Sequence, residues 1–113
     1  MENLFSYGTL QLPRVQLELF GRILKLDADT LIGFKKEKIK IKAKSTVNGI
    51  TEEEHVIISY SGNAVDIIEG AVLSITLFEL ERADEYETDD YKRISATLQS
   101  GRSSWVYVKN DKQ

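Results

Sequence analysis

An acidic segment in the last third of the chain is the part of this sequence best suited to proton-transfer chemistry. Residues 77–87 read LFELERADEYE. A helix turns about 100° per residue, which places four of these residues on one side of it: Leu77, Leu80, Asp84 and Glu87. Glu87 then lies only about 20° from Leu80, so its carboxylate faces the core, where partial desolvation raises its pKa toward that of a general base at neutral pH. The alternative is a solvated glutamate in the last turn of an acidic helix.

A glycine turn near the N-terminus is the second candidate. Residues 5–10 read FSYGTL, the end of a predicted strand followed by Gly8. In such a turn successive backbone N–H groups can point into one concavity and hold an anionic group such as a carboxylate. An ordinary turn without a ligand is the alternative.

Three further sets of residues carry weaker signals. Lysines alternate along 38–44, where they bind phosphates or form a solvated strand face that resists aggregation. Tyr91, Trp105 and Tyr107 either line a pocket or belong to the core, as aromatic residues in strands commonly do. The single histidine, His55, has no metal-ligand partner nearby in the sequence, and we expect a structural role for it.

Composition narrows the possible chemistry. The 113 residues contain no cysteine and one histidine, which excludes thiol nucleophiles and zinc-thiolate sites and makes a Ser-His-Asp triad hard to build. Carboxylate chemistry is what remains, and we expect no metal or other cofactor. The length predicts one domain spanning 1–113, large enough for a single core and one small pocket.

Charge and hydropathy argue against a nucleic-acid partner and against a membrane span. The net charge is −3, which argues against general attraction to nucleic acid. No apolar run approaches the ~20 residues of a membrane span, and no basic region precedes an apolar stretch at the N-terminus. We therefore expect a cytoplasmic protein that neither spans a membrane nor binds nucleic acid, although the lysine-rich strand keeps the latter open as a third hypothesis.

The elements that must position these residues are short and mixed. Pro13 and Gly21 bracket a short helix, and the Thr76 to Glu79 pattern is a capping box that starts a helix near Leu77. Glycine and asparagine turns, Asn48–Gly49 among them, separate the predicted strands. These are 3–6, 23–26, 29–34, 38–44, 55–60, one within 65–75, and a closing hairpin of 91–98 and 104–108. The pattern predicts an α+β fold: a curled sheet or small mixed β-barrel with one or two short helices.

Three separated pieces of the chain, in this order, together resemble the γ-glutamylcyclotransferase-like family, which includes plant avirulence-induced-gene-like proteins and bacterial relatives. Residues 5–10 look like the family's Tyr-Gly-Ser/Thr-Leu loop, and 31–34 like its Gly-Phe strand. Residues 69–73 resemble its Val-x-Gly-x-Leu-Tyr strand. The most specific piece is 83–87 followed by 91–93, similar to the family's Leu-Asp-x-Tyr/Phe-Glu and Tyr-x-Arg.

The resemblance implies a site and a reaction. Tyr7, Gly8, Thr9 and Leu10 would line the substrate pocket together with Tyr91, and Glu87 would be the catalytic acid and base. The implied reaction cyclises a γ-glutamyl amide to 5-oxoproline and releases an amine, so the expected partner is a small γ-glutamyl molecule. A non-catalytic small-molecule-binding module on the same fold is the alternative.

The sequence departs from the family pattern in three places. Thr88 stands where many relatives have glycine, Ala83 replaces the usual leucine, and the middle of the chain lacks a Tyr-Pro pair. The turn after the helix and its packing are therefore expected to differ.

Overall fold

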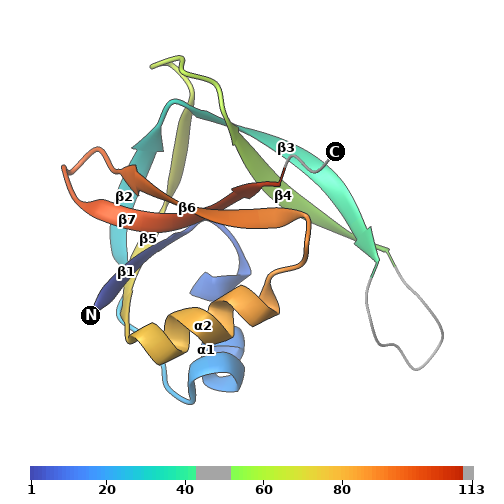
Figure 1. Ribbon diagram of the computed structural model, residues 1–113, viewed down its shortest axis with the longest axis vertical. Helices are drawn as coiled ribbons and strands as arrows, with labels where there is room; N and C mark the ends of the chain where they lie inside the picture. The colour runs from blue at the N-terminus through green and yellow to red at the C-terminus, as the bar shows by residue number, and fades with distance from the viewer. Residues whose placement is uncertain (43–51, 111–113) are drawn as a thin grey trace.

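The computed structural model describes residues 1–42 and 52–110 and has two helices packed on one face of a curled sheet (Figure 1). Within the described residues there are seven strands, two α-helices and a short 3-10 helix. In chain order the elements are β1 (Glu2–Ser6), η1 (Thr9–Gln11), α1 (Pro13–Phe20), β2 (Asp27–Ile32), β3 (Phe34–Lys42), β4 (Glu52–Tyr60), β5 (Ile67–Ile75), α2 (Leu77–Tyr86), β6 (Tyr91–Thr97) and β7 (Ser103–Lys109).

The strands form two sheets. One has five strands in the order β2-β5-β1-β7-β6, and the other is the two-stranded hairpin β3-β4. β1 lies in the middle of the larger sheet, antiparallel to β5 and parallel to β7. The predicted α+β fold with a curled sheet is confirmed, but hydrogen bonds between the described strands do not close it into a barrel.

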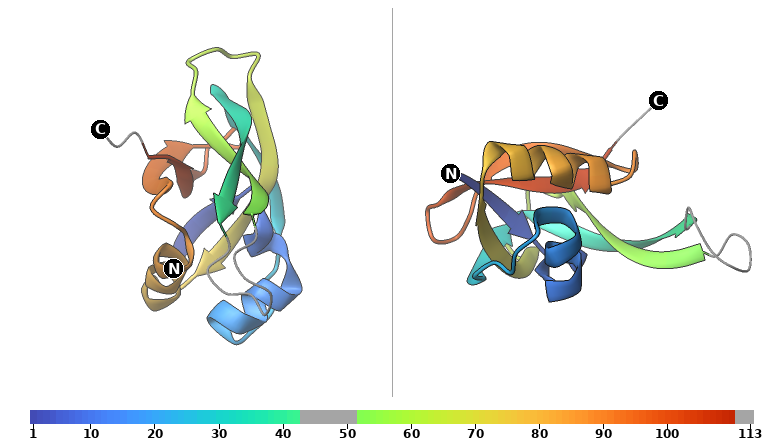
Figure 2. Two further views of the ribbon diagram at one scale, coloured as in Figure 1. Left: turned by 90° about the vertical axis from the view of Figure 1, so that its right-hand side faces the viewer. Right: turned by 90° about the horizontal axis from the view of Figure 1, so that it is seen from below.

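Side chains of the central strand alternate between two cores, as the pleat of a strand requires. Leu4 is fully buried on the helix side, in a cluster that includes Leu80 and Ala83 of α2. Its neighbour Phe5 is 1% exposed on the opposite side, in a cluster that reaches Ile58 of the hairpin. The molecule therefore has three layers, helices, sheet and hairpin, and Figure 2 shows the hairpin extending away from the helices.

Gly70 permits the close approach of β1 and β5. A Cβ atom at this position would overlap the carbonyl oxygen of Ser6 and lie 2.8 Å from the ring of Phe5. Only a residue without a side chain fits there without moving the end of β1. Because the predicted substrate loop begins directly after Ser6, this glycine helps to set where the loop starts.

The sheet curls where β2 passes into β3. Gly33, between the two strands, has φ +89°, a left-handed conformation that favours glycine. In the middle of β2, Asp29 accepts a 2.6 Å hydrogen bond from the Ser100 hydroxyl, and the Thr30 carbonyl accepts from the N–H of Gln99 at 2.8 Å. The turn between β6 and β7 is thus attached to β2 without a strand pair.

Most predicted elements are present, with two corrections. Residues 23–26 are not a strand, because Leu24 is held instead by the buried Gln16 side chain, which accepts the Leu24 N–H at 2.8 Å. Asp27 to Asp29 do not separate two strands but are the first half of β2, where Asp29 is satisfied by Ser100. Aspartate is typical of turns, so the local sequence predicted a break in the strand there. The distant hydrogen-bond partners, Gln16 and Ser100, cannot be recognised from the local sequence.

Several predicted features lie on residues or side chains that the structure does not describe. The Asn48–Gly49 turn, Ala43 and Lys44 lie outside the described residues. So do the side chains of 39–42 and 52–55, which include His55, the Glu52 to Glu54 run and most of the lysine-rich strand face. No helix within residues 1–42 and 52–110 is long and apolar enough to cross a membrane.

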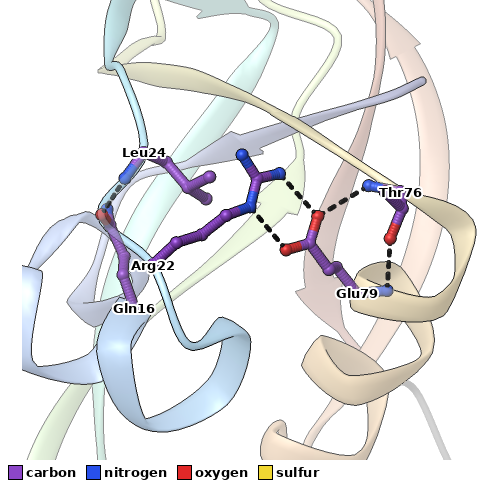
Figure 3. A network of polar contacts seen from close by, with 5 residues as sticks. All are labelled: Gln16, Arg22, Leu24, Thr76 and Glu79. Atoms are coloured by element: carbon purple, nitrogen blue, oxygen red, sulfur yellow. Dashed lines mark hydrogen bonds and ion pairs between the residues drawn. The ribbon is translucent and has the colours of Figure 1, made fainter.

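Helix α2 begins at the predicted capping box. Thr76 Oγ1 accepts from the Glu79 N–H at 3.1 Å, and Glu79 Oε1 accepts from the Thr76 N–H at 2.9 Å. Glu79 also receives two hydrogen bonds from Arg22, at 2.8 and 2.9 Å (Figure 3). These contacts lower the pKa of Glu79 from its usual 4.5 to about 2, mainly through the hydrogen bonds from Arg22. The pair also ties the start of α2 to the segment that follows α1.

We predict that Glu79→Gln lowers the free energy of unfolding at pH 7 by about 1–2 kcal/mol, because glutamine keeps the capping hydrogen bond and loses the charge facing Arg22. The folded-state pKa lies below the unfolded value, so this contribution is present above pH 4.5 and is lost as the pH falls toward 2. Urea unfolding of wild type and Glu79→Gln between pH 7 and pH 3 measures the difference in their free energies of unfolding, which should become smaller as the pH falls. Glu81→Gln, an exposed position on the same helix, is the control, and a difference independent of pH would contradict the prediction.

Candidate functional site

Glu87 lies just beyond the end of α2, not on the helix. The helix ends at Tyr86, and Glu87 is its C-cap, with φ −72° and ψ 141°. Its N–H donates to the Ala83 carbonyl at 3.1 Å, and its side chain is half-buried. Helical spacing predicted that Glu87 and Leu77 lie on the core-facing side of the helix. Glu87 is half-buried but is not part of the helix, so the spacing does not explain its burial. The prediction is wrong for Leu77, which is 62% exposed in the first turn.

Burial makes the Glu87 carboxyl a weaker acid than an exposed glutamate. It raises the pKa of Glu87 from 4.5 to about 7, because the charged form is poorly hydrated at this position. Three tyrosines, Tyr7, Tyr91 and Tyr107, lie near enough to respond to its charge. Burial and then Glu87 raise the pKa of Tyr91 to about 12, and burial, Tyr91 and Glu87 raise that of Tyr7 well above its usual value.

Hydrogen bonds bring the N-terminal loop to the end of α2. The hydroxyls of Thr9 and Tyr86 are 2.9 Å apart, so the loop contacts the residue that precedes Glu87. The Tyr7 hydroxyl donates to the Tyr107 carbonyl of β7 at 2.6 Å. The Tyr91 hydroxyl donates to the Val56 carbonyl of β4 at 3.0 Å, which attaches the hairpin to the same region.

The remaining loop residues differ in which of their groups a ligand could contact. Gly8 and Thr9 are exposed, whereas the Leu10 side chain is 3% exposed in the helix-side core, so Leu10 offers only its backbone to a ligand. The Gly8 N–H is directed to Ser6 Oγ at 3.3 Å. Thr9 and Leu10 begin a 3-10 helix, and N–H groups at a helix start have no partner within the helix. The buried Gln16 side chain donates to the Leu10 carbonyl at 2.9 Å and holds the loop in place.

A cleft opens beside Glu87 on the sheet face that carries the helices. Its volume is about 390 Å³, enough for a small ligand. Tyr91, Trp105 and Tyr107, the aromatic residues considered for a pocket or for the core, all contribute to its wall, and Tyr107 also belongs to the core. The lining residues are Asp84, Glu87, Thr88, Asp89, Tyr91, Lys92, Arg93, Trp105 and Tyr107.

Sequence reasoning missed the polar contacts that hold this region together. Asp84 accepts two hydrogen bonds from Arg93, at 2.8 and 3.0 Å, and one from the Tyr107 hydroxyl at 2.7 Å. The Tyr86 contact with Thr9 was not foreseen either. The only sequence signal was the presence of both Asp84 and Arg93 in the motif that carried the family resemblance. Their pairing depends on the register that sets Arg93 beside Tyr107 across β6 and β7.

Threonine fits at the position where the family pattern has glycine. None of the described non-glycine residues has a positive φ, so the turn after α2 does not require glycine at 88. The Thr88 hydroxyl donates to Asp90 at 3.1 Å, and its carbonyl accepts from the Tyr91 N–H at 3.1 Å. Ala83 is fully buried against the helix-side core. The tight turn between Glu87 and Tyr91 is therefore built from threonine and aspartate contacts.

Comparison with known proteins establishes the family. The sequence matches the family described as "Gamma-glutamyl cyclotransferase, AIG2-like" over residues 4–113, and the chain belongs to that family. A comparison with curated proteins finds no match.

Three solved structures share the fold. The Arabidopsis thaliana protein At5g39720.1 is 23% identical with a TM-score of 0.71, covering 99% of this chain and 70% of its own. The Arabidopsis thaliana protein At3g28950.1 is 20% identical with a TM-score of 0.65, covering 96% of this chain and 61% of its own. A structure named "Gamma-glutamyl cyclotransferase" is 18% identical with a TM-score of 0.69, and the match covers 99% of this chain and 68% of that one. This chain thus spans 61% to 70% of the length of these proteins.

We predict that Glu87→Gln makes the protein more stable at pH 8, by about 1–3 kcal/mol. The folded-state pKa lies above the unfolded value, so folding disfavours the charged carboxylate; the penalty appears as the pH rises from 4.5 to about 7 and is absent below that range. Urea unfolding at pH 4.5 and pH 8 measures it. Glu85→Gln, at an exposed position two residues away, should show no such pH-dependent gain. Equal or lower stability of Glu87→Gln at pH 8 would show that Glu87 is not desolvated.

Proposed function

We propose that the protein is a γ-glutamylcyclotransferase-type enzyme that converts a γ-glutamyl amide to 5-oxoproline and an amine. The observation that carries the proposal is the half-buried Glu87, whose pKa is raised to about 7 beside Tyr7 and Tyr91, at the position that the family motif gives to its acid and base. Membership in the gamma-glutamyl cyclotransferase, AIG2-like family supports the class of reaction.

In this reaction the substrate supplies its own nucleophile. The α-amino nitrogen attacks the γ-carbonyl carbon and forms the new C–N bond of a five-membered ring, while the carbonyl π electrons move to the oxygen. The amide C–N bond then breaks as the carbonyl re-forms, and the amine departs. The protein contributes chiefly by folding the substrate so that its two ends meet, which is a proximity effect.

Glu87 carries the proton between the two nitrogens. As the carboxylate it takes a proton from the attacking nitrogen, and as the carboxylic acid it returns that proton to the departing one. A pKa of about 7 suits both roles, because near neutral pH the two forms are similarly populated. The starting enzyme must be in its carboxylate form, so the rate should rise as the pH increases through about 7.

The loop supplies binding contacts in the proposal. The backbone N–H groups of Thr9 and Leu10 hold the substrate's α-carboxylate or the developing oxyanion, since Gly8 already donates to Ser6. Tyr91 lines the cleft beside Glu87, whereas Tyr7 and the rest of the loop are not among the lining residues of the cleft; Tyr7 lies near enough to respond to the charge of Glu87. The partner is then a small γ-glutamyl molecule, and no nucleic acid or membrane enters the mechanism.

We predict that Glu87→Gln keeps the fold and lowers kcat for 5-oxoproline release by about 10²–10⁴-fold, the contribution typical of general acid–base catalysis. The measurement is 5-oxoproline formation from a panel of γ-glutamyl amino acids and γ-glutamyl amines at pH 8, with wild type, Glu87→Gln and the control Glu85→Gln.

An active Glu87→Gln enzyme would contradict the role of Glu87. Binding of γ-glutamyl ligands without turnover by the wild type, measured calorimetrically on the same panel, would instead support the alternative of a non-catalytic binding module.

A further inference from the structure

The connection between α2 and β6 carries both Glu87 and Tyr91, and one side-chain pair spans it. Asp84 lies in the last turn of α2 and Arg93 lies two residues into β6. Their two hydrogen bonds, at 2.8 and 3.0 Å, join residues nine positions apart in the sequence, and the candidate base lies between them. The side chains are 36% and 25% exposed, so water screens the pair only in part.

A third residue attaches this pair to the opposite side of the site. The Tyr107 hydroxyl donates to Asp84 at 2.7 Å, while the Tyr107 carbonyl accepts from the Tyr7 hydroxyl at 2.6 Å. One residue of β7 therefore joins the α2 end of the site to the start of the substrate loop. Arg93 is itself fixed, since its guanidinium lies 4.4 Å from the Trp105 ring centre.

We propose that Asp84, Arg93 and Tyr107 form a clamp that positions Glu87 near Tyr7 and places a balanced pair of charges beside it. The proposal rests on the proposed role of Glu87. A C-cap residue one step beyond a helix has no helical geometry to fix its side chain, and helix ends fray unless they are held. The clamp holds the last turn of α2, and the Thr88 contacts hold the following turn, so Glu87 lies between two fixed points.

The clamp contains one negative side chain, Asp84, and one positive side chain, Arg93. Asp84 and Arg93 both line the cleft with Glu87, and their opposite charges offset each other there. Removing one partner leaves the other charge unopposed. The other titratable or charged groups that face Glu87 within the described residues come from four segments: Tyr7 after β1, Asp89 in the turn, Tyr91 and Lys92 on β6, and Tyr107 on β7.

The first experiment titrates the ¹³C-labelled Glu87 carboxyl by NMR in four proteins. Asp84→Asn leaves the Arg93 cation and should lower the midpoint by about half a pH unit or more; Arg93→Gln leaves the Asp84 anion and should raise it by a similar amount. The double variant should return to the wild-type midpoint. Shifts of the same sign in both single variants, or no shift, would overturn the charge balance. This titration needs no substrate, so it decides the point even if no γ-glutamyl amide is turned over.

The second experiment separates position from charge. Arg93→Lys keeps the charge and loses the paired hydrogen bonds, so the midpoint should stay near wild type while kcat falls about tenfold. Tyr107→Phe removes one hydroxyl and should also lower kcat about tenfold with little change in KM. Tyr60→Phe, an exposed tyrosine of β4, is the matched control and should leave both constants unchanged. Unchanged kcat in folded Arg93→Lys and Tyr107→Phe would overturn the positioning role.

Discussion

The central placement of β1 between β5 and β7 is the constraint on which the other parts of the structure depend. β1 ends at the N-terminal loop, β5 leads into α2, and β7 carries Tyr107, so the pairing of these three strands brings the parts of the candidate site together. Its two pleat faces divide the molecule into a helix-side and a hairpin-side core. Gly70 allows β5 to approach the end of β1 closely enough for this arrangement.

Two glutamates near opposite ends of α2 show how the same side chain takes different roles. Glu79 lies in the first turn, where the helix N-terminus and Arg22 both favour its anion, and its pKa falls to about 2. Glu87 lies past the last turn, where burial disfavours the anion and the pKa rises to about 7. The first stabilises the fold at neutral pH, and the second destabilises it. A carboxylate kept at such a cost to stability is characteristic of a functional site.

The candidate site is held together by hydroxyl and backbone contacts. Thr9 and Tyr86, Tyr7 and Tyr107, and Tyr91 and Val56 each join two elements that are distant in sequence. Tyrosine suits this role because its ring excludes water while its hydroxyl satisfies a buried partner. Tyr7, Tyr91 and Tyr107 all lie near enough to respond to the charge of Glu87, and burial raises the pKa of Glu87 to about 7.

Local patterns in the sequence determined most of the elements, and the family motif pointed to the candidate base. The capping box at Thr76, the proline and glycine around α1, and the motif that contains Glu87 depend on neighbours within a few residues, and the structure has both helices where these signals placed them. Local patterns did not predict that Asp27 to Asp29 are in a strand or that 23–26 are not, because Ser100 and Gln16 satisfy those segments from elsewhere in the chain. Only the tertiary structure decided why Glu87 is buried, through strand order and register that place Tyr7, Tyr91 and Tyr107 around it. It also decided that Asp84 pairs with Arg93 and Tyr107, since a hydrogen bond between distant residues leaves no periodicity in the sequence.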